Sequence, residues 1–246
     1  MTNWIYFGWS NGLGVLFCVL FVLIGVLKNK NKSYRKQLKP IKFLFILVVV
    51  LEIIKITYHI CVQSYFPPQR YPIVFCSLIM YTYPIICFND KDKMITRVSI
   101  ALSIIPVVVI SGMYLFIFPD ATNASIYSFI MNLHSRFYHF AMLAGALYML
   151  ILKMYDFRFK DYFMAASIAS LYIVFCTVVS LLLKGDISYF GPDSGPLKFF
   201  YNLFGYAIGN VLICIVIYIV AFLVYYIINY FILKQNKSEM NFTLRE

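Results

Sequence analysis

The chain has 246 residues, of which 62% are apolar and only 13% are charged, and its formal net charge is +11. With a mean hydropathy of +0.81, this composition excludes a soluble globular domain and is typical of a membrane protein. A helix that crosses ~30 Å of hydrocarbon needs roughly 20 mostly apolar residues, so stretches of about that length are candidate spans.

Seven apolar stretches approach this length, and charged or turn-forming segments such as NDKDK and FPDATNAS separate them. No connection is long enough to fold as a soluble domain, so we predict an all-α polytopic protein with seven transmembrane helices in one domain, residues 1–246. The last stretch is the longest, and we expect it to tilt or to extend beyond the bilayer. The predicted spans cover about residues 6–27, 42–61, 72–89, 98–118, 129–152, 162–183 and 204–233.

The basic residues predict the orientation of the chain. Sixteen of them follow spans 1, 3, 5 and 7, whereas the opposite connections hold only Arg70, Lys184 and Lys198. The positive-inside rule then predicts an outer N-terminus and a cytoplasmic C-terminus in a cell membrane, with the first span retained rather than cleaved as a signal peptide. We expect membrane lipids as partners, with anionic headgroups on the cytoplasmic side, and no nucleic acid. The sixteen residues are Lys28, Lys30, Lys32, Arg35, Lys36, Lys39, Lys42, Lys91, Lys93, Arg97, Lys153, Arg158, Lys160, Lys234, Lys237 and Arg245.

The six cysteines predict neither a disulfide framework nor a metal site. Cys61 and Cys76 lie near the outer ends of spans 2 and 3, and a bridge between these two remains an alternative. The chain has no CxxC, no HExxH and no glycine-rich phosphate loop, so no metal and no cofactor is expected. The other four cysteines lie inside spans and are interpreted as small apolar residues: Cys18, Cys87, Cys176 and Cys214.

Ionisable residues inside a span are costly, and span 2 carries three of them. Glu52, Lys55 and His59 are spaced i, i+3, i+7 and therefore share one helical face. One interpretation is a structural Glu52–Lys55 ion pair that holds helices together, and another is a polar wall that lines a cavity. A third is that Lys55 and His59 reach the membrane interface.

Span 3 opens with YPIVFCSLIMYTYP, residues 71–84. Pro72 is tolerated in the first helical turn, where its missing N–H has no partner to lose, and Cys76 follows one turn deeper. Cys76 is interpreted either as a nucleophile or as an apolar filler.

Span 5 carries four polar side chains in its outer half. Arg136 and His139 share one face at i, i+3, while His134 and Tyr138 share another at i, i+4. A guanidinium at this depth needs a carboxylate, backbone carbonyls or a lipid phosphate as a partner. His134 alternatively lies in the headgroup zone.

These positions converge on one layer. Cys76, Lys55, His59, Arg136 and His139 all fall in the outer parts of three spans, 2, 3 and 5, which places a thiol, imidazoles, a guanidinium and an amine at similar depth. The late loop LLLKGDISYFGPDSGPLKFF is predicted to be a structured cover for such a site, although its Asp186 and Asp193 could also simply pair with Lys184 or Lys198. In the last span, Gly205 and Gly209, followed by Asn210, are typical of helix packing.

The segment RYPIVFCSL resembles the LPLHLCS segment of the YwaF-like integral membrane proteins, whose eukaryotic relatives include the transmembrane-protein-164 acyltransferases. The resemblance covers most of the chain and implies lipid-directed acyl transfer with Cys76 as the nucleophile. Under this hypothesis His139 or His134 is the base and Arg136 binds a lipid phosphate, while Glu52 with Lys55 orients the polar cavity.

Two departures from the family pattern bear on catalysis. Val74 replaces the histidine that precedes the cysteine, and the late loop reads Ser188-Tyr189 where the family has Asn-Tyr. If the missing imidazole is the base, the protein is a binding or transport relative without catalysis.

Three function classes therefore remain. The first is a membrane protein whose outer-leaflet polar cavity binds or transports a lipid or small solute through Arg136, Glu52, Lys55, His59 and Tyr138. The second is a lipid acyltransferase or thiol hydrolase that uses Cys76. The third is a structural membrane subunit. Amino-acid usage rich in Phe, Tyr, Ile, Lys and Asn resembles that of an AT-rich bacterial genome, and the oligomeric state is left open.

Overall fold

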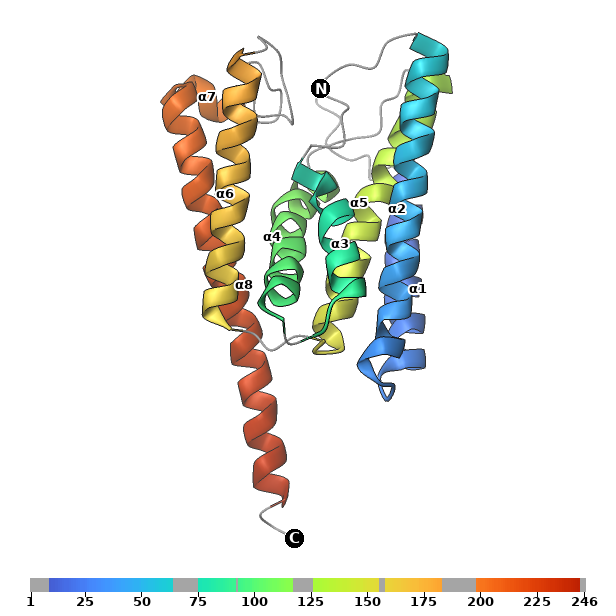
Figure 1. Ribbon diagram of the computed structural model, residues 1–246, viewed down its shortest axis with the longest axis vertical. Helices are drawn as coiled ribbons and strands as arrows, with labels where there is room; N and C mark the ends of the chain where they lie inside the picture. Colours follow the sequence, from blue (N-terminus) through green and yellow to red (C-terminus); the bar gives the residue numbers. More distant parts are fainter. Residues whose placement is uncertain are drawn as a thin grey trace.

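The structure, a computed structural model, describes residues 9–63, 75–91, 93–116, 126–154, 158–182 and 198–243, and these ranges contain helices and turns but no strand. The predicted all-α class is therefore confirmed for the described part of the chain (Figure 1). The helices are α1 (Trp9–Asn29), α2 (Tyr34–Gln63), the 3₁₀ turn η2 (Phe75–Ser77), α3 (Leu78–Phe88), α4 (Met94–Phe116), α5 (Ile126–Ile151), α6 (Phe159–Leu182), α7 (Lys198–Phe204) and α8 (Tyr206–Thr243).

Each predicted span overlaps with one long helix or, for span 3, with η2 and α3, although several bounds differ, and α7 is an additional short helix before the last one. Four helices among the described residues are long and apolar enough to cross a membrane: α1, α2, α6 and α8. By contrast, η2 and α3 together cover only about 22 Å, less than the hydrocarbon thickness. The count of seven spans and the orientation of the termini stay predictions, and Pro72 lies outside the described residues.

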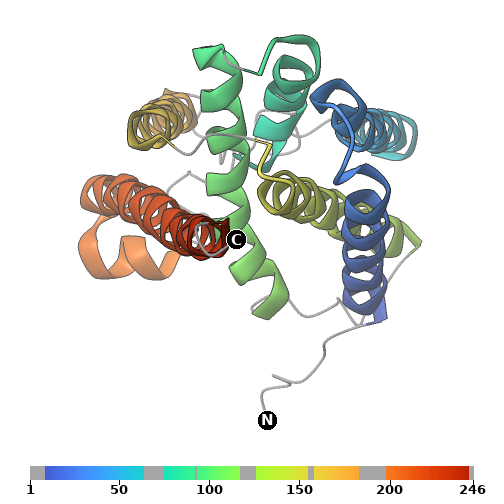
Figure 2. The ribbon, with the colours of Figure 1, turned by 90° about the horizontal axis from the view of Figure 1, so that it is seen from below.

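Helix α4 is the central element of the bundle. It packs against α3 and α5 on one side and against α6 and α8 on the other. Viewed along the bundle, α4 runs between the α6–α8 pair and the group formed by α1, α2, α3 and α5 (Figure 2). Within that group, α1 packs on α5, and α2 packs on both α3 and α5.

The helices alternate in direction, so the connections fall at two ends. The α1–α2 and α3–α4 turns lie at one end of the bundle, together with the C-terminus of α5 and the N-terminus of α6, and this end is here called the basic end (Figure 1). The turn η2 and helix α7 lie at the opposite end, here called the η2 end. Helix α8 continues past the basic end, as expected for a last span that is longer than the membrane is thick.

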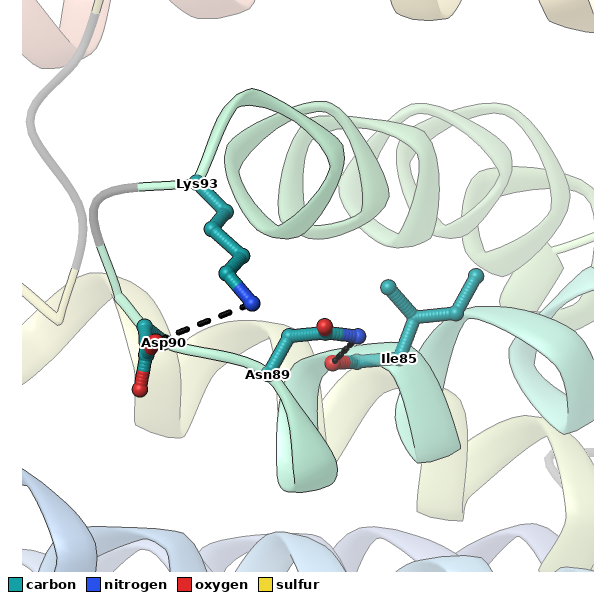
Figure 3. Close-up of polar contacts among 4 residues, drawn as sticks. All are labelled: Ile85, Asn89, Asp90 and Lys93. Carbon is teal, nitrogen blue, oxygen red and sulfur yellow. Dashed lines mark hydrogen bonds and ion pairs between the residues drawn. The ribbon is translucent and has the colours of Figure 1, made fainter.

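The α3–α4 turn shows how the basic end is built (Figure 3). The backbone N–H and the side-chain Nδ2 of Asn89 both donate to the Ile85 carbonyl at 3.1 Å, which satisfies an orphan carbonyl at the C-terminus of α3. Lys93 pairs with Asp90 at 3.7 Å, but both side chains are exposed, so this pair contributes little. The Asn89 cap therefore ends α3 and lets α4 begin five residues later.

Helices α2, α3 and α5 cross closely at Gly145. A Cβ at this position would overlap the Tyr83 hydroxyl and approach Leu44 Cδ1 to 3.1 Å. Tyr83 cannot easily move, because it is buried and its hydroxyl donates to the Met142 carbonyl at 3.5 Å. Glycine is thus required here for close approach rather than for backbone conformation.

Replacing Gly145 with Ala is expected to destabilise the protein by about 1–3 kcal/mol, because the added methyl overpacks the crossing. Unfolding by SDS in mixed micelles, followed by circular dichroism, measures the change. Gly12→Ala is the matched control, since nothing lies within 4 Å of a Cβ at Gly12. Adding Tyr83→Phe should relieve part of the loss, and equal stabilities of Gly145→Ala and Gly12→Ala would contradict the close crossing.

Candidate functional site

Helix α2 buries one continuous stripe of side chains that changes character along its length. The stripe is apolar toward the basic end and becomes polar after Val48, where Glu52, Lys55 and His59 are only 2%, 7% and 0% exposed. The predicted shared face is therefore confirmed, and Glu52 and Lys55 form an ion pair within α2. The members of the stripe are Leu38, Ile41, Leu44, Val48, Glu52, Lys55 and His59.

Cys76 lies in the 3₁₀ turn η2, just before α3 begins at Leu78. The prediction that Cys76 lies within an α-helix, one turn after Pro72, is therefore wrong. Helix α3 begins several residues after the start of the apolar run. The thiol is partly buried, and its sulfur is within hydrogen-bonding reach of its own backbone N–H and of the Ser77 hydroxyl. It also lies within electrostatic range of Lys55 and Glu52.

Lys55 and Cys76 lie at the same distance from the basic end of the bundle. The Lys42 ammonium lies 5.1 Å from the centre of the Phe88 ring, which aligns α2 and α3 at the basic end. Counting from that level at ~1.5 Å per α-helical residue and ~2.0 Å per 3₁₀ residue, Lys55 and Cys76 are both about 20 Å away. A thiol and an ammonium from different helices thus share one layer, as predicted.

Helix α5 brings the aromatic part of the site. Tyr138 is 3% exposed, and its ring centre lies 5.8 Å from that of His134 and 6.1 Å from that of His139. Its hydroxyl lies beside Ser77 and within electrostatic range of Cys76 and Glu52. Tyr138 therefore links the two imidazoles of α5 to the thiol of η2.

The second predicted face of α5 carries Arg136 and His139, which interact electrostatically. Arg136 is buried and His139 is partly buried. His139 Nδ1 lies 2.6 Å from the Ser135 carbonyl oxygen, so Nδ1 carries the proton and donates it. In the neutral ring, Nε2 is then the acceptor nitrogen.

The remaining predictions concern a bridge between Cys61 and Cys76, a metal site and the late loop. No disulfide joins any of the six cysteines, all of which the structure describes, so Cys61 and Cys76 are not bridged. Within the described ranges, no three His, Cys, Asp or Glu side chains form a group that could hold a metal ion. Val74 and the predicted cover, with Asp186, Asp193, Ser188 and Tyr189, lie outside the described residues.

Sequence reasoning missed Ser77 as a member of the site. Ser77 is 1% exposed and directly follows the candidate nucleophile, and its hydroxyl lies near both Cys76 and Tyr138. Its presence in the quoted segment RYPIVFCSL was a usable signal, because a hydroxyl next to a thiol is a donor to the thiolate.

The model of the TMEM164 family matches residues 2–226. The chain belongs to the TMEM164 family. The match covers α1 through α7 and the part of α8 up to residue 226, and hence every residue of the candidate site. TMEM164 membership confirms one half of the predicted relationship, while the YwaF-like name stays a prediction. No curated protein and no solved structure matches the chain. With its family and its apolar helices, the chain is an integral membrane protein.

Proposed function

We propose that this TMEM164-family protein transfers acyl groups between membrane lipids through a thioester on Cys76. The observation that carries the proposal is the position of Cys76: the thiol lies at the depth of the buried Lys55 ammonium, beside the Ser77 hydroxyl and within electrostatic range of the Tyr138 hydroxyl. A cysteine that served only as filler needs none of these polar neighbours, each of which is costly inside a membrane.

The reaction uses the thiolate as the nucleophile. The base takes the proton of the Cys76 thiol, and the thiolate, which lies close to the Lys55 ammonium and the Ser77 hydroxyl, adds to the carbonyl carbon of a donor ester and forms a C–S bond. When the tetrahedral intermediate collapses, the C–O bond breaks and the departing alkoxide takes a proton from the protonated base. An acceptor alcohol then gives its proton to the base, attacks the thioester and releases the thiolate, while water as acceptor would give hydrolysis.

His139 is the favoured base of the two candidates. Its Nδ1–H donates to the Ser135 carbonyl, which orients the ring and makes Nε2 the basic nitrogen of the neutral imidazole, the atom that would take the proton of the thiol or the acceptor alcohol. His134 is the alternative, because it shares the face of Tyr138. Either imidazole would supply the base that Val74 cannot, since valine stands where the family pattern has histidine.

The depth of the site favours a lipid that enters the bundle. If the Lys42 level marks one edge of ~30 Å of hydrocarbon, Cys76 at about 20 Å lies about 10 Å below the other edge. With the N-terminus outside, that edge is the outer leaflet of the cell membrane. The ester must then move inward from the headgroup region, and the buried Arg136 would bind its phosphate with two N–H donors.

A second candidate is binding or transport of a lipid or small solute without a nucleophile. The burial of Glu52, Lys55, His59 and Arg136 favours it, because four ionisable side chains can bind a polar solute without help from Cys76. This function predicts that Glu52→Gln abolishes solute flux into vesicles while Cys76→Ser does not.

The first test looks for the acyl-enzyme. Protein in vesicles of dioleoyl phosphatidylcholine and dioleoyl phosphatidylethanolamine should acquire an oleoyl mass on Cys76 that hydroxylamine removes. Cys76→Ser should abolish the hydroxylamine-labile adduct, whereas Cys87→Ser, a buried cysteine near the basic end of α3, should retain it. An unmodified Cys76 in the wild type would reject acyl transfer between these lipids, and stability losses alone in Cys76→Ser and Glu52→Gln would support the structural class.

A further inference from the structure

The Tyr138 hydroxyl is an unusual feature of the site. It is buried and makes no hydrogen bond of standard geometry, although it lies beside Ser77 and close to Cys76. A buried hydroxyl without a partner loses the hydrogen bonds that it makes in water, so it is costly to keep. A group that arrives beside Cys76 and accepts a hydrogen bond would remove this cost.

Tyr83 shows that a buried tyrosine hydroxyl in this protein can have a hydrogen-bond partner. It is also a tyrosine that is almost fully buried in the same helical group, but its hydroxyl donates to the Met142 carbonyl. Tyr83 therefore locks α3 to α5, whereas the Tyr138 hydroxyl makes no hydrogen bond of standard geometry and lies beside Ser77, within electrostatic range of the Cys76 thiol.

We propose that Tyr138 is the oxyanion donor of the acyl-transfer reaction: its O–H binds the carbonyl oxygen of the acyl group while the Cys76 thiolate adds to the carbonyl carbon. This inference rests on the proposed function and assigns a further catalytic residue to it. Addition of the thiolate moves one electron pair onto the carbonyl oxygen, and collapse of the intermediate returns that pair as the ester C–O bond breaks. The tyrosine keeps its proton throughout.

The surroundings explain why a donor is needed. Glu52 lies close enough to Cys76 and Tyr138 to interact with both, so its negative charge opposes a second negative charge on the carbonyl oxygen. Lys55 offsets that charge through the ion pair with Glu52. A fixed O–H directed to the developing charge then stabilises it in a site where water is scarce.

Tyr138→Phe tests the role, because it removes only the hydroxyl and keeps the ring that contacts His134 and His139. In vesicles of the two dioleoyl phospholipids, oleoyl-Cys76 formation should slow by about a hundredfold or more, as for loss of one oxyanion donor. Alkylation of Cys76 by iodoacetamide should keep its wild-type rate, since that reaction forms no oxyanion. Tyr83→Phe is the matched control and should acylate at the wild-type rate.

The outcomes separate this inference from the proposed function. If Tyr138→Phe acylates Cys76 as fast as the wild type, Tyr138 is not the donor, although acyl transfer through Cys76 stands. If acylation and alkylation slow equally, Tyr138 acts on the thiol or on its exposure, and the oxyanion role is rejected. Should Tyr138→Phe fail to fold, 4-fluorophenylalanine at 138 fills the space of the hydroxyl without an O–H and takes its place. An unacylated wild type would reject the proposed function, and this inference with it.

Discussion

Glu52→Gln is expected to destabilise the protein by about 3–5 kcal/mol, the usual cost of removing one partner from a buried ion pair. The glutamine is nearly isosteric, so the loss does not come from packing. It comes from Lys55, which is 7% exposed and would keep a positive charge without its carboxylate partner. SDS titration in mixed micelles with a circular dichroism readout gives the change in unfolding free energy.

A second pair in the same chain provides the control. Asp90 and Lys93 have the same i, i+3 spacing, but their side chains are 77% and 56% exposed. Asp90→Asn should therefore change stability by no more than about 0.5 kcal/mol. If Glu52→Gln proves equally mild, water reaches Lys55, and the polar half of α2 lines a hydrated cavity rather than a dry ion pair.

Removing both charges separates stability from function. In Glu52→Leu combined with Lys55→Leu, most of the lost stability should return, because neither charge of this pair remains to be buried without its partner. Formation of oleoyl-Cys76 should be slower in the double variant than in the wild type, because the Lys55 ammonium, whose positive charge stabilises a nearby thiolate, is gone. Recovery of both stability and acylation would assign the pair a purely structural role.

The polar stripe of α2 was predictable from the sequence because it depends on one helix alone. Glu52, Lys55 and His59 stand out in an apolar run, and their spacing fixes a shared face in any helix. Helix ends were less predictable. Helix α2 begins at Tyr34 rather than near 42, because hydropathy detects where apolar residues start and the first turns of this helix are polar.

Contacts between helices required the structure. The proximity of Tyr138 to Cys76 links residues on two separate spans, and spacing along the chain cannot supply it. Helix α7 was predicted as loop, because its seven residues follow a segment rich in glycine and proline. The clearest omission is at the basic end, where Arg97 was interpreted as an orientation signal and Asp161 as part of a connection.

Arg97 and Asp161 in fact form an ion pair between α4 and α6. The Arg97 Nε donates to Asp161 Oδ2 at 2.9 Å, and the carboxylate side chain is completely buried. Asp161→Asn should therefore cost about 3–5 kcal/mol, because it removes the negative charge from a buried ion pair. Lys160→Gln, at the exposed neighbouring position, should be close to neutral in the same SDS titration.

Because the Arg97–Asp161 pair lies away from the candidate site, Asp161→Asn is expected to lower stability without changing acylation of Cys76. Asp161 tethers the α6–α8 pair to the central helix α4, whereas the candidate site is built from α2, η2 and α5 on the other side of α4. Under conditions where Asp161→Asn remains folded, oleoyl-Cys76 should form at the wild-type rate despite the lower stability. Slower acylation by the folded variant would instead show that the α6–α8 pair contributes to the site, and would extend the site across α4.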